Sequence, residues 1–370
     1  MDPLPYETVR GDGVVLRPPR TDDADDIAAG CADPLTQRYV PIMPDPYTRA
    51  DAIAWIAQAG QATDRRDLVI ADPATDRVIG GCGLHHVSHA DLAAEVGYWV
   101  APWARRRGVG TRATVALTDW GFHQGFGRIE LMTRPDNMPS QRVAIAAGYR
   151  REGRRRAAAV DRDGMRYDLI AWARLATDPP GPTPRALPDF PGGRLSDGVV
   201  ELRPLGPDDI ADLTVLRRLP EVAATTVKPE PGNPAFFARL CAEAPGQWLA
   251  GEAVRVTIWD AATGAFAGEI GMFQFEPGTG QAMIGYDLLP AWRGRGFATR
   301  AVRLLAGWAF HHAGLARLIA GTAPENVASQ RVLERAGFQR EGYQRSRLPG
   351  PAGTRIDDIA YALLPGELAG

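Results

Sequence analysis

Two short segments of the chain have the residue types and spacing of a phosphate-binding loop. One reads RRRGVG, residues 105–110, and the other reads RGRGFA, residues 293–298. Both stand directly before a predicted helix. Small residues let the backbone approach a ligand closely, the amides of a helix start point in one direction, and the helix dipole adds positive potential. Each loop therefore predicts a pocket for a phosphate or pyrophosphate, although a glycine-rich turn from strand to helix has the same composition.

The first loop also fits the dinucleotide-binding pattern. GVGTRA, residues 108–113, satisfies G-x-G-x-x-[GA], and Glu130 stands where such a fold places its ribose-binding acid, about 20 residues farther on. The second loop breaks this pattern, because Thr299 follows its glycines and Ile319 replaces the acid. No GK[ST] follows either loop, which excludes the P-loop nucleotidases.

The chain consists of two collinear copies. YWVAPWARRRGVGTRA returns as YDLLPAWRGRGFATRA, and NMPSQRVAIAAGY, residues 137–149, returns as NVASQRVLERAGF, residues 326–338. A period this long is that of a whole domain. Between the copies, residues 177–194 are rich in proline and glycine, which predicts an extended, stiff linker. We therefore expect one domain at residues 1–176 and a second at residues 195–370.

Each copy shows the same order of predicted elements. A first strand leads into a helix that starts at paired aspartates, and a second helix follows. Three apolar runs then predict a meander of strands, at residues 67–71, 77–85 and 95–100 and at residues 253–260, 265–275 and 282–288. The loops open amphipathic helices at residues 108–125 and 296–313, and a strand, a helix and two last strands complete each copy. This order predicts an α/β fold with a mixed sheet.

The pairing of [QR]-x-x-G-x-[GA] at a helix start with N-x-x-S-Q-R-V and A-G-[YF] resembles the GCN5-related N-acetyltransferase (GNAT) superfamily, and most closely its RimJ/RimL-like branch. The resemblance spans nearly all of both halves. It implies two tandem GNAT domains, each a mixed, splayed central β-sheet flanked by helices, with acetyl-CoA as acyl donor in the splay. It also implies direct transfer of an acetyl group from the thioester to a primary amine, without a metal.

By this resemblance, loop amides hold the CoA pyrophosphate, main-chain groups at the strand ends pair with the pantetheine arm, and two asparagines steady the far end of that arm. The residues expected to bind the cofactor are, in the first half, Val100, Arg105, Arg106, Arg107, Gly108, Val109, Gly110, Thr111 and Asn137, and, in the second half, Leu288, Arg293, Gly294, Arg295, Gly296, Phe297, Ala298, Thr299 and Asn326.

Acetyl transfer also needs a group that takes the proton of the amine. An alkyl ammonium has a pKa of roughly 8 to 10.5, so a carboxylate near the thioester would help to deprotonate it. Glu95 is the candidate in the first half, as a similar Glu occurs in many RimL-like sequences. Met283 occupies the matching place in the second half, where Glu269 or Asp287 would have to substitute. An acid on a sheet edge is equally compatible with simple solvation.

The acid that protonates the departing thiolate is less directly indicated. Many superfamily members carry a tyrosine seven residues after the asparagine, but Ala144 and Leu333 stand there. The resemblance suggests Ser140 and Ser329 instead, although both positions also suit ordinary helix capping. Since both loops survive, we expect both halves to bind acetyl-CoA, with one half catalytic and the other degenerate. The first half is favoured as the catalytic one because it keeps Glu95.

Two further clusters invite other interpretations. His85, His86 and His89 do not predict a metal site, because adjacent strand residues face opposite ways; they could instead line the acceptor cleft. The arginine run at residues 150–156 predicts a solvated face, not a nucleic-acid site, because a strand divides such charge between two faces and the net charge of the chain is -2.

Composition sets the outer limits of function. A chain of 370 residues with 45% hydrophobic content suffices for two cores, and its three cysteines are too few for a disulfide framework. No signal segment or membrane span is expected, so the sequence predicts a cytoplasmic protein without a nucleic-acid or membrane partner, either a monomer with an internal pseudo-dimer or a homodimer. The acceptor stays open, because the segments expected to contact it, residues 38–49 and 225–237, differ between the copies. The acceptor could be an amine of a small molecule or peptide, or a protein N-terminus. The alternative function is that of a non-catalytic acetyl-CoA-binding scaffold.

Overall fold

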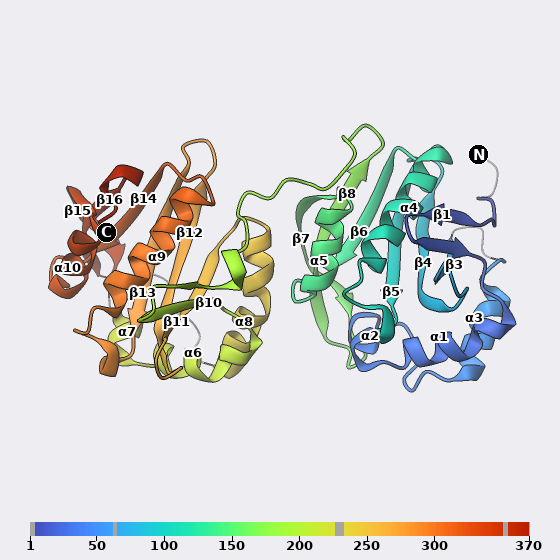
Figure 1. The fold of residues 1–370 in the computed structure, drawn as a ribbon, viewed down its shortest axis with the longest axis horizontal. Helices are drawn as coiled ribbons and strands as arrows, with labels where there is room; N and C mark the ends of the chain where they lie inside the picture. Colours follow the sequence, from blue (N-terminus) through green and yellow to red (C-terminus); the bar gives the residue numbers. More distant parts are fainter. Residues whose placement is uncertain (1–3, 62–64, 226–232, 351–353, 370) are drawn as a thin grey trace. The chain divides into compact units, whose positions relative to one another are not determined.

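The computed structural model describes residues 4–61, 65–225, 233–350 and 354–369. The chain divides into two compact units, Met1–Pro184 (unit 1) and Arg185–Gly370 (unit 2). Within the described residues, each unit contains one eight-stranded mixed sheet with flanking helices, which confirms the predicted fold class (Figure 1).

Unit 1 has the strand order β1-β2-β3-β4-β5-β6-β8-β7. Its strands are β1 (Val9–Gly11), β2 (Val14–Arg17), β3 (Arg66–Ala71), β4 (Val78–Ser88), β5 (Ala93–Val100), β6 (Arg128–Thr133), β7 (Arg150–Val160) and β8 (Arg166–Leu175). Its helices are α1 (Ala24–Cys31), α2 (Pro34–Tyr39), α3 (Arg49–Gln58), α4 (Val109–His123) and α5 (Met138–Ala146). The three predicted meander strands and the long helix after the loop are all present, whereas β1 and α2 were not predicted.

Unit 2 repeats this order as β15-β16-β14-β13-β12-β11-β10-β9. Its strands are β9 (Leu195–Ser196), β10 (Val200–Pro204), β11 (Val254–Asp260), β12 (Phe266–Glu276), β13 (Gln281–Leu288), β14 (Arg317–Thr322), β15 (Gln339–Pro349) and β16 (Arg355–Leu363). Its helices are α6 (Ile210–Arg217), α7 (Pro220–Thr225), α8 (Pro234–Leu249), α9 (Phe297–His311) and α10 (Val327–Ala336).

Both sheets open at the same place. The parallel pair β5–β6 is hydrogen-bonded over the registers Ala93↔Arg128 to Glu95↔Glu130, and the pair β13–β14 over Gln281↔Arg317 to Met283↔Ile319. Beyond these registers, which lie wholly within the described residues, the strands part: β5 stays paired with β4, and β6 with β8. The predicted splay is therefore present in each unit.

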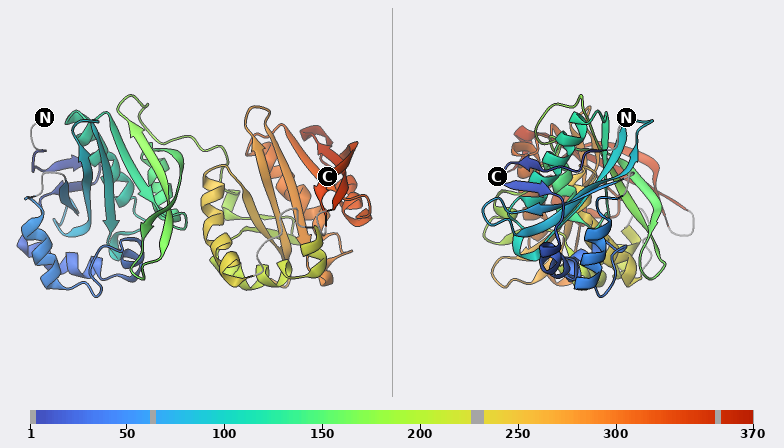
Figure 2. Two further views of the ribbon diagram at one scale, coloured as in Figure 1. Left: turned by 180° about the vertical axis from the view of Figure 1, so that it is seen from behind. Right: turned by 90° about the vertical axis from the view of Figure 1, so that its right-hand side faces the viewer.

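The two faces of each sheet carry different helices. In unit 1, α4 packs on the face that includes Leu84 and Val96, while α1 and α3 pack on the opposite face against Val69 and Trp99. In unit 2, α9 occupies the first of these positions and α6 and α8 the second. Figure 1 shows α4 and α9 in front of their own sheets, and Figure 2 shows the same sheets from behind. Each sheet thus has one helix layer on either face.

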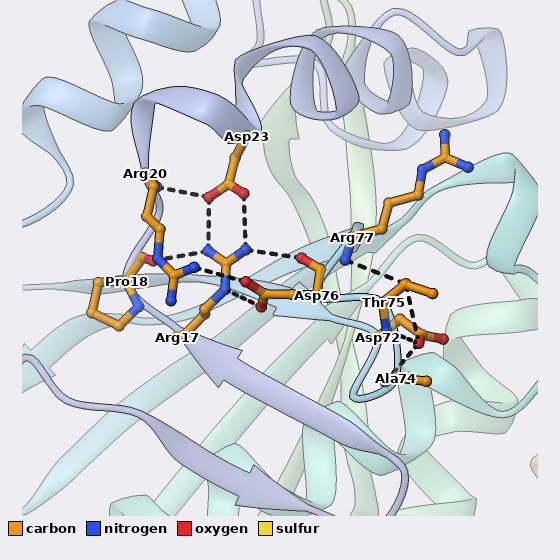
Figure 3. Close-up of polar contacts among 9 residues, drawn as sticks. All are labelled: Arg17, Pro18, Arg20, Asp23, Asp72, Ala74, Thr75, Asp76 and Arg77. Carbon is orange, nitrogen blue, oxygen red and sulfur yellow. Dashed lines mark hydrogen bonds and ion pairs between the residues drawn. The ribbon is translucent and has the colours of Figure 1, made fainter.

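A buried arginine fixes the start of α1 in unit 1 (Figure 3). Arg17, at the end of β2, is 3% exposed and donates to both carboxylate oxygens of Asp23 at 2.8 and 2.9 Å. It also donates through Nε to Oδ1 of Asp76, in the β3–β4 turn, at 2.8 Å. In unit 2 the matching Arg203 bonds Glu201 on its own strand, and Asp209, which matches Asp23, has its pKa raised, chiefly by burial. The clamp is therefore particular to unit 1.

The predicted linker, residues 177–194, is docked over much of its length. Thr183 donates through Oγ1 to the carbonyl of Tyr149 at 2.8 Å, within unit 1. Leu187 and Phe190 are buried in the core of unit 2, where the Phe190 and Trp248 ring centroids are 4.7 Å apart. The segment also contains a 3-10 turn at Pro191–Gly193, and its two apolar side chains bind its second part to unit 2.

Bilayer-spanning helices were also sought. None of the helices in the described part of the chain has the length and apolar character that crossing a membrane requires.

Candidate active sites of the two units

The two predicted phosphate loops form left-handed bends. In unit 1, Arg106 and Gly108 have φ of 59° and 74°; in unit 2, Gly294 and Gly296 have φ of 72° and 82°. Gly108 and Gly296 are the N-cap residues of the 15-residue helices α4 and α9. The first amides of a helix lack partners within it, so each bend presents several donors at the positive end of a helix dipole. This geometry fits a diphosphate.

The loop arginines Arg105 and Arg293 brace the bends from within. Nε of Arg105 donates to the carbonyl of Val100 at 3.1 Å, and its guanidinium also bonds Asp33 and Thr36 of α2. Burial opposes ionisation of Asp33, but the bonds from Arg105 and Thr36 outweigh it and lower the pKa of that carboxyl. The positive charges of Arg105 and Arg293, which were expected to contribute to ligand binding, are therefore engaged by other groups of the protein.

Arg293 makes the same kind of brace in unit 2. Its Nε donates to the carbonyl of Leu288 at 3.0 Å, and its Nη1 lies 3.2 Å from Oε1 of Glu221 on α7. Val100 and Leu288, predicted to pair with a pantetheine arm, therefore already accept a side-chain hydrogen bond each.

The other predicted cofactor residues divide by exposure. Exposed residues at the bends are Arg106, Arg107, Gly108, Gly294, Arg295 and Gly296, and buried or half-buried ones that begin the helices are Val109, Gly110, Thr111, Phe297, Ala298 and Thr299. The first group is positioned to meet a ligand with its backbone or side chains, and the second anchors the helix start in the core.

A further arginine at the first loop was not predicted. Arg112 stands one turn after Gly108, and a Cβ at Gly108 would lie 3.1 Å from its Nη1. Its Nε is buried and has no hydrogen-bond partner among the described residues. The matching Arg300 of unit 2 is paired with Asp197 at 2.7 Å. The signal in the sequence was its spacing of four from the loop glycine, which returns an arginine to the same helix face.

The asparagine–serine motif forms the other wall of each splay. Asn137 accepts a hydrogen bond from the amide of Ser140 at 3.2 Å, and Asn326 accepts one from the amide of Ser329 at 3.0 Å. The predicted capping is therefore present at the starts of α5 and α10. These bonds fix the backbone of the first helical turn that carries each serine.

A tyrosine from the facing strand meets each serine. The hydroxyl of Tyr98 on β5 lies 2.9 Å from Oγ of Ser140, and that of Tyr286 on β13 lies 2.9 Å from Oγ of Ser329. Burial raises the pKa of Tyr286 to about 12 and that of Tyr98 as well, so both hydroxyls stay protonated near neutral pH. The tyrosines were missed as site residues, although their repetition in both copies was visible in the sequence.

The predicted acids have different surroundings. Glu95 is the last residue of β5 that pairs with β6, and its Oε2 lies 3.3 Å from Nδ1 of His86. Glu269 is 6% exposed and forms an ion pair with Arg217 of α6, whose Nη1 lies 3.9 Å from Oδ2 of Asp287. The carboxylates of Glu269 and Asp287 thus both face Arg217, whereas that of Glu95 contacts a histidine.

The three histidines do not alternate as predicted. His86 has a left-handed φ of 49°, and the β4–β5 register shifts between His85 and Ser88. This bulge turns His86 toward Glu95, while His85 lies cross-strand from Glu95 at its own register. A bulge adds one residue and so cancels the alternation on which the prediction depended. In the described part of the chain, no group of three His, Cys, Asp or Glu side chains could hold a metal ion.

His85 lies on a shelf made by two glycines. A Cβ at Gly83 would lie 3.0 Å from Nε2 of His85, and one at Gly97 would lie 3.2 Å from it. Oδ1 of Asp67 on β3 is 3.9 Å from the same nitrogen. Burial lowers the pKa of His85, against the opposing effect of Asp67 and Glu95.

Unit 2 repeats the shelf with other side chains. Phe273 replaces His85, and a Cβ at Gly271 would lie 2.7 Å from its ring. The guanidinium of Arg255, which replaces Asp67, lies 5.0 Å from the ring centroid.

A buried acid of unit 2 was not predicted: Asp358 on β16 is 1% exposed, lies against Gly321 of β14, and has its pKa raised, chiefly by burial.

Comparison with known proteins identifies the family to which the chain is similar. The profile of the acetyltransferase (GNAT) domain matches residues 14–150 and 200–339. The chain is 44% identical over 92 residues to the probable N-acetyltransferase YjcK of Bacillus subtilis (strain 168), which is 25% of this chain and 51% of that protein. It is 36% identical over 153 residues to the uncharacterized N-acetyltransferase p20 of Bacillus licheniformis, 40% of this chain and 84% of that protein. The chain thus spans about half of the first relative and most of the second.

Solved structures are also similar to parts of the chain. RimJ of Mycobacterium smegmatis, in complex with CoA-disulfide, is 24% identical with a TM-score of 0.43, over 48% of this chain and 87% of that one. The ribosomal-protein-S5-alanine acetyltransferase of Vibrio fischeri is 20% identical with a TM-score of 0.43, over 48% of this chain and 99% of that one. The two ranges matched by the family profile each contain the splayed strand pair of one sheet with its left-handed bend, so the chain belongs to the GNAT acetyltransferase family and carries a domain of that family in each unit.

Proposed function

We propose that this protein is an acetyl-CoA-dependent N-acetyltransferase that acts on a primary amine of a small molecule or peptide, with one domain in residues 1–176 and the other in residues 195–370. The observation that carries the proposal is the pair of left-handed bends at the start of α4 and α9, each beside an open splay. Bound acetyl-CoA would supply an activated acetyl group as a thioester.

The residues at each bend are suited to hold a diphosphate. Backbone amides after Gly108 and Gly296 would donate to its oxygens, and in unit 1 the guanidinium of Arg112 would add charge beside the bend. Gly110 lies within 3.5 Å, measured from its Cβ position, of Tyr98, Val143 and Val100, so a larger side chain would press on the inner wall of the splay.

The hydroxyl pair at each splay is suited to give a proton to a thiolate. Ser140, whose amide donates to Asn137 and whose Oγ is bonded to Tyr98, can donate a proton and be reprotonated through the tyrosine hydroxyl. Ser329 and Tyr286 have the same arrangement in unit 2. In unit 1 the carboxylate of Glu95 lies beside a histidine, His86, while in unit 2 Glu269 is engaged by Arg217, which favours unit 1 as the one that deprotonates the amine.

The surroundings of the first splay suit a cationic amine. Glu95 and Glu130 are direct neighbours on β5 and β6, and Glu130 is paired with Arg128 at 2.6 Å, so Glu95 is the carboxylate that would attract the amine. The first predicted acceptor segment, residues 38–49, is held at the loop after β6 by a bond from Arg38 to Asp136 at 2.7 Å and at the β7–β8 turn by a bond from Arg162 to Asp45 at 2.6 Å. Of the second acceptor segment, residues 226–232 lie outside the described residues.

The test is an amine panel with acetyl-CoA, read out as release of free thiol. The panel should contain small amines, polyamines, amino acids and peptides with free N-termini. Release with a small amine or a peptide supports the proposal, and release confined to protein N-termini identifies a protein N-terminal acetyltransferase instead. Calorimetric binding of CoA without thiol release for any amine would identify a non-catalytic binding protein.

A further inference from the structure

We propose that His85 takes the proton of the acceptor amine in unit 1, with Asp67 as its positioning residue. This inference rests on the proposed acetyltransferase function. It assigns the proton to an imidazole on β4, a strand away from Glu95, the carboxylate that the sequence indicated.

The placement of His85 is specific to the start of the splay. Its register partner across β4 and β5 is Glu95, and Glu95 is the last residue of β5 that pairs with β6. The next residue of β5 on the same face is Gly97, and Nε2 of His85 lies over it, 3.2 Å from its Cβ position. Because Gly83 and Gly97 have no side chains, the imidazole lies over both of them, and Gly97 stands on β5 two residues beyond its last pairing with β6. Any larger residue at either position would displace it.

The charges around His85 suit a group that gains a proton and passes it on. Asp67 faces it from β3 and Arg65 from the residue before that strand, Glu95 faces it from β5, and His86 is its neighbour on β4. The two carboxylates stabilise an imidazolium, while burial keeps the ring neutral beforehand. The side chain is 36% exposed, which leaves a route for the proton to water.

The reaction balances with His85 in this role. The amine arrives as an ammonium ion, and one proton goes to Nε2 of the neutral imidazole and from there to water. The nitrogen lone pair so freed bonds to the acetyl carbon as the carbon–sulfur bond breaks, and a second proton of that nitrogen goes to the thiolate through Ser140. The products are an amide, a thiol and one proton.

Unit 2 provides an internal contrast for this assignment. It keeps the glycine shelf, at Gly271 and Gly285, and the bulge, at Gln274, where φ is 52°. Phe273 lies on the shelf and cannot accept a proton, and Met283 stands in the place of Glu95. Conversion of His85 to phenylalanine therefore installs in unit 1 a side chain that the same scaffold already accommodates.

The experiment measures kcat against pH at saturating amine, using an amine on which the intact protein is active. Because kcat reports groups in the bound complex, the wild type should lose activity as the pH falls through the pKa of His85, below about 6.5. His85→Phe should lower kcat about 100-fold or more and abolish this acid limb. His123→Phe, at the far end of α4, should change neither. If His85→Phe does not fold, as judged by circular dichroism, His85→Gln takes its place.

Asp67→Asn separates positioning from simple support of the fold. Removal of the carboxylate 3.9 Å from Nε2 should move the acid limb to lower pH, because Asp67 raises the pKa of His85. A purely structural role would lower kcat without moving the limb. Wild-type kcat and an unchanged acid limb in His85→Phe would overturn the inference, as would activity that persists there and disappears in Asp358→Asn. A wild type that releases no thiol with any amine would instead overturn the proposed function itself.

Discussion

The two units use one scaffold for different chemistry at the same point. In unit 1 the shelf beside the splay carries His85, with Asp67 and Glu95 on either side, whereas in unit 2 it carries Phe273, with Arg255 stacked on its ring. The bulge, the shelf glycines and the left-handed bends are common to both. The fold and the loops therefore impose no requirement on the proton-transfer residues. A copy can lose its proton-transfer residues and still keep the fold and the loops.

A second difference lies under the strand that flanks the splay. In unit 1, Trp99 fills the space above Gly81 and against Gly30 of α1, where Cβ atoms would each lie 2.4 Å from its ring. In unit 2, the same place holds Arg217 between Glu269 and Asp287. An apolar contact has become a buried ion cluster, which ties up the two acids that could have replaced Glu95.

The largest difference in stability between the two units is expected when the Arg17 clamp is removed. Arg17→Ala should lower the free energy of unfolding of unit 1 by about 3 to 5 kcal/mol, because Asp23 would remain buried without its partner. Arg203→Ala, its half-exposed counterpart, should cost about 1 kcal/mol or less. Hydrogen exchange along a denaturant series, read separately for peptides of β2–β3 and β10–β11, resolves the two. Equal losses would show that the clamp does not distinguish the units.

A smaller effect is expected at the hydroxyl pair. Tyr98→Phe should lower kcat about 10-fold to 100-fold, because Ser140 loses the group that reprotonates it. The matched control is Tyr149→Phe, which removes a core hydroxyl 2.6 Å from Oγ1 of Thr118 and should lower stability by about 1 kcal/mol without lowering kcat. A larger loss of kcat in Tyr286→Phe than in Tyr98→Phe would place turnover in unit 2.

The bends should also differ in how strongly charge contributes to binding. Arg112→Ala should weaken CoA binding about 5-fold, since its guanidinium lies beside Gly108. Arg300→Ala should change the Kd less than 2-fold, because Asp197 already neutralises it. Calorimetric titration of each variant with CoA measures both effects. The same loss in both variants would mean that the Arg300–Asp197 pair opens when the ligand binds.

The smallest effect is a difference in backbone conformation. Arg106 adopts a left-handed φ for which Gly294 is used in unit 2. Arg106→Gly should therefore change stability little, because relief of strain offsets the greater freedom of the unfolded chain, while Gly294→Ala should cost about 1 kcal/mol. Thermal unfolding followed by calorimetry tests both. A gain from Gly294→Ala would mean that the bend relaxes in solution.

Local motifs were the predictable part of this molecule. The bends, the asparagine caps and the meander strands depend on residues close together in the chain, and the repetition of the copies supported each of them. The shelf under His85 was not predictable, because it requires a bulge in β4 and the register of β5. Asp358 and Arg217 likewise depend on contacts between elements far apart in the sequence. Strand alternation misplaced the histidines for the same reason.

The short parallel junction in each sheet has a mechanical consequence. Three residue pairs join β5 to β6, and three join β13 to β14, so each domain consists of two half-sheets fastened at one end. Along the open seam, the part of the chain that the structure describes provides no neighbouring strand for the peptide groups of the flanking strands. A ligand with amide groups of its own that entered the seam would act as a surrogate strand and stiffen the domain across its weakest line. Slower amide exchange at both seams on addition of CoA would be the signature of that closure.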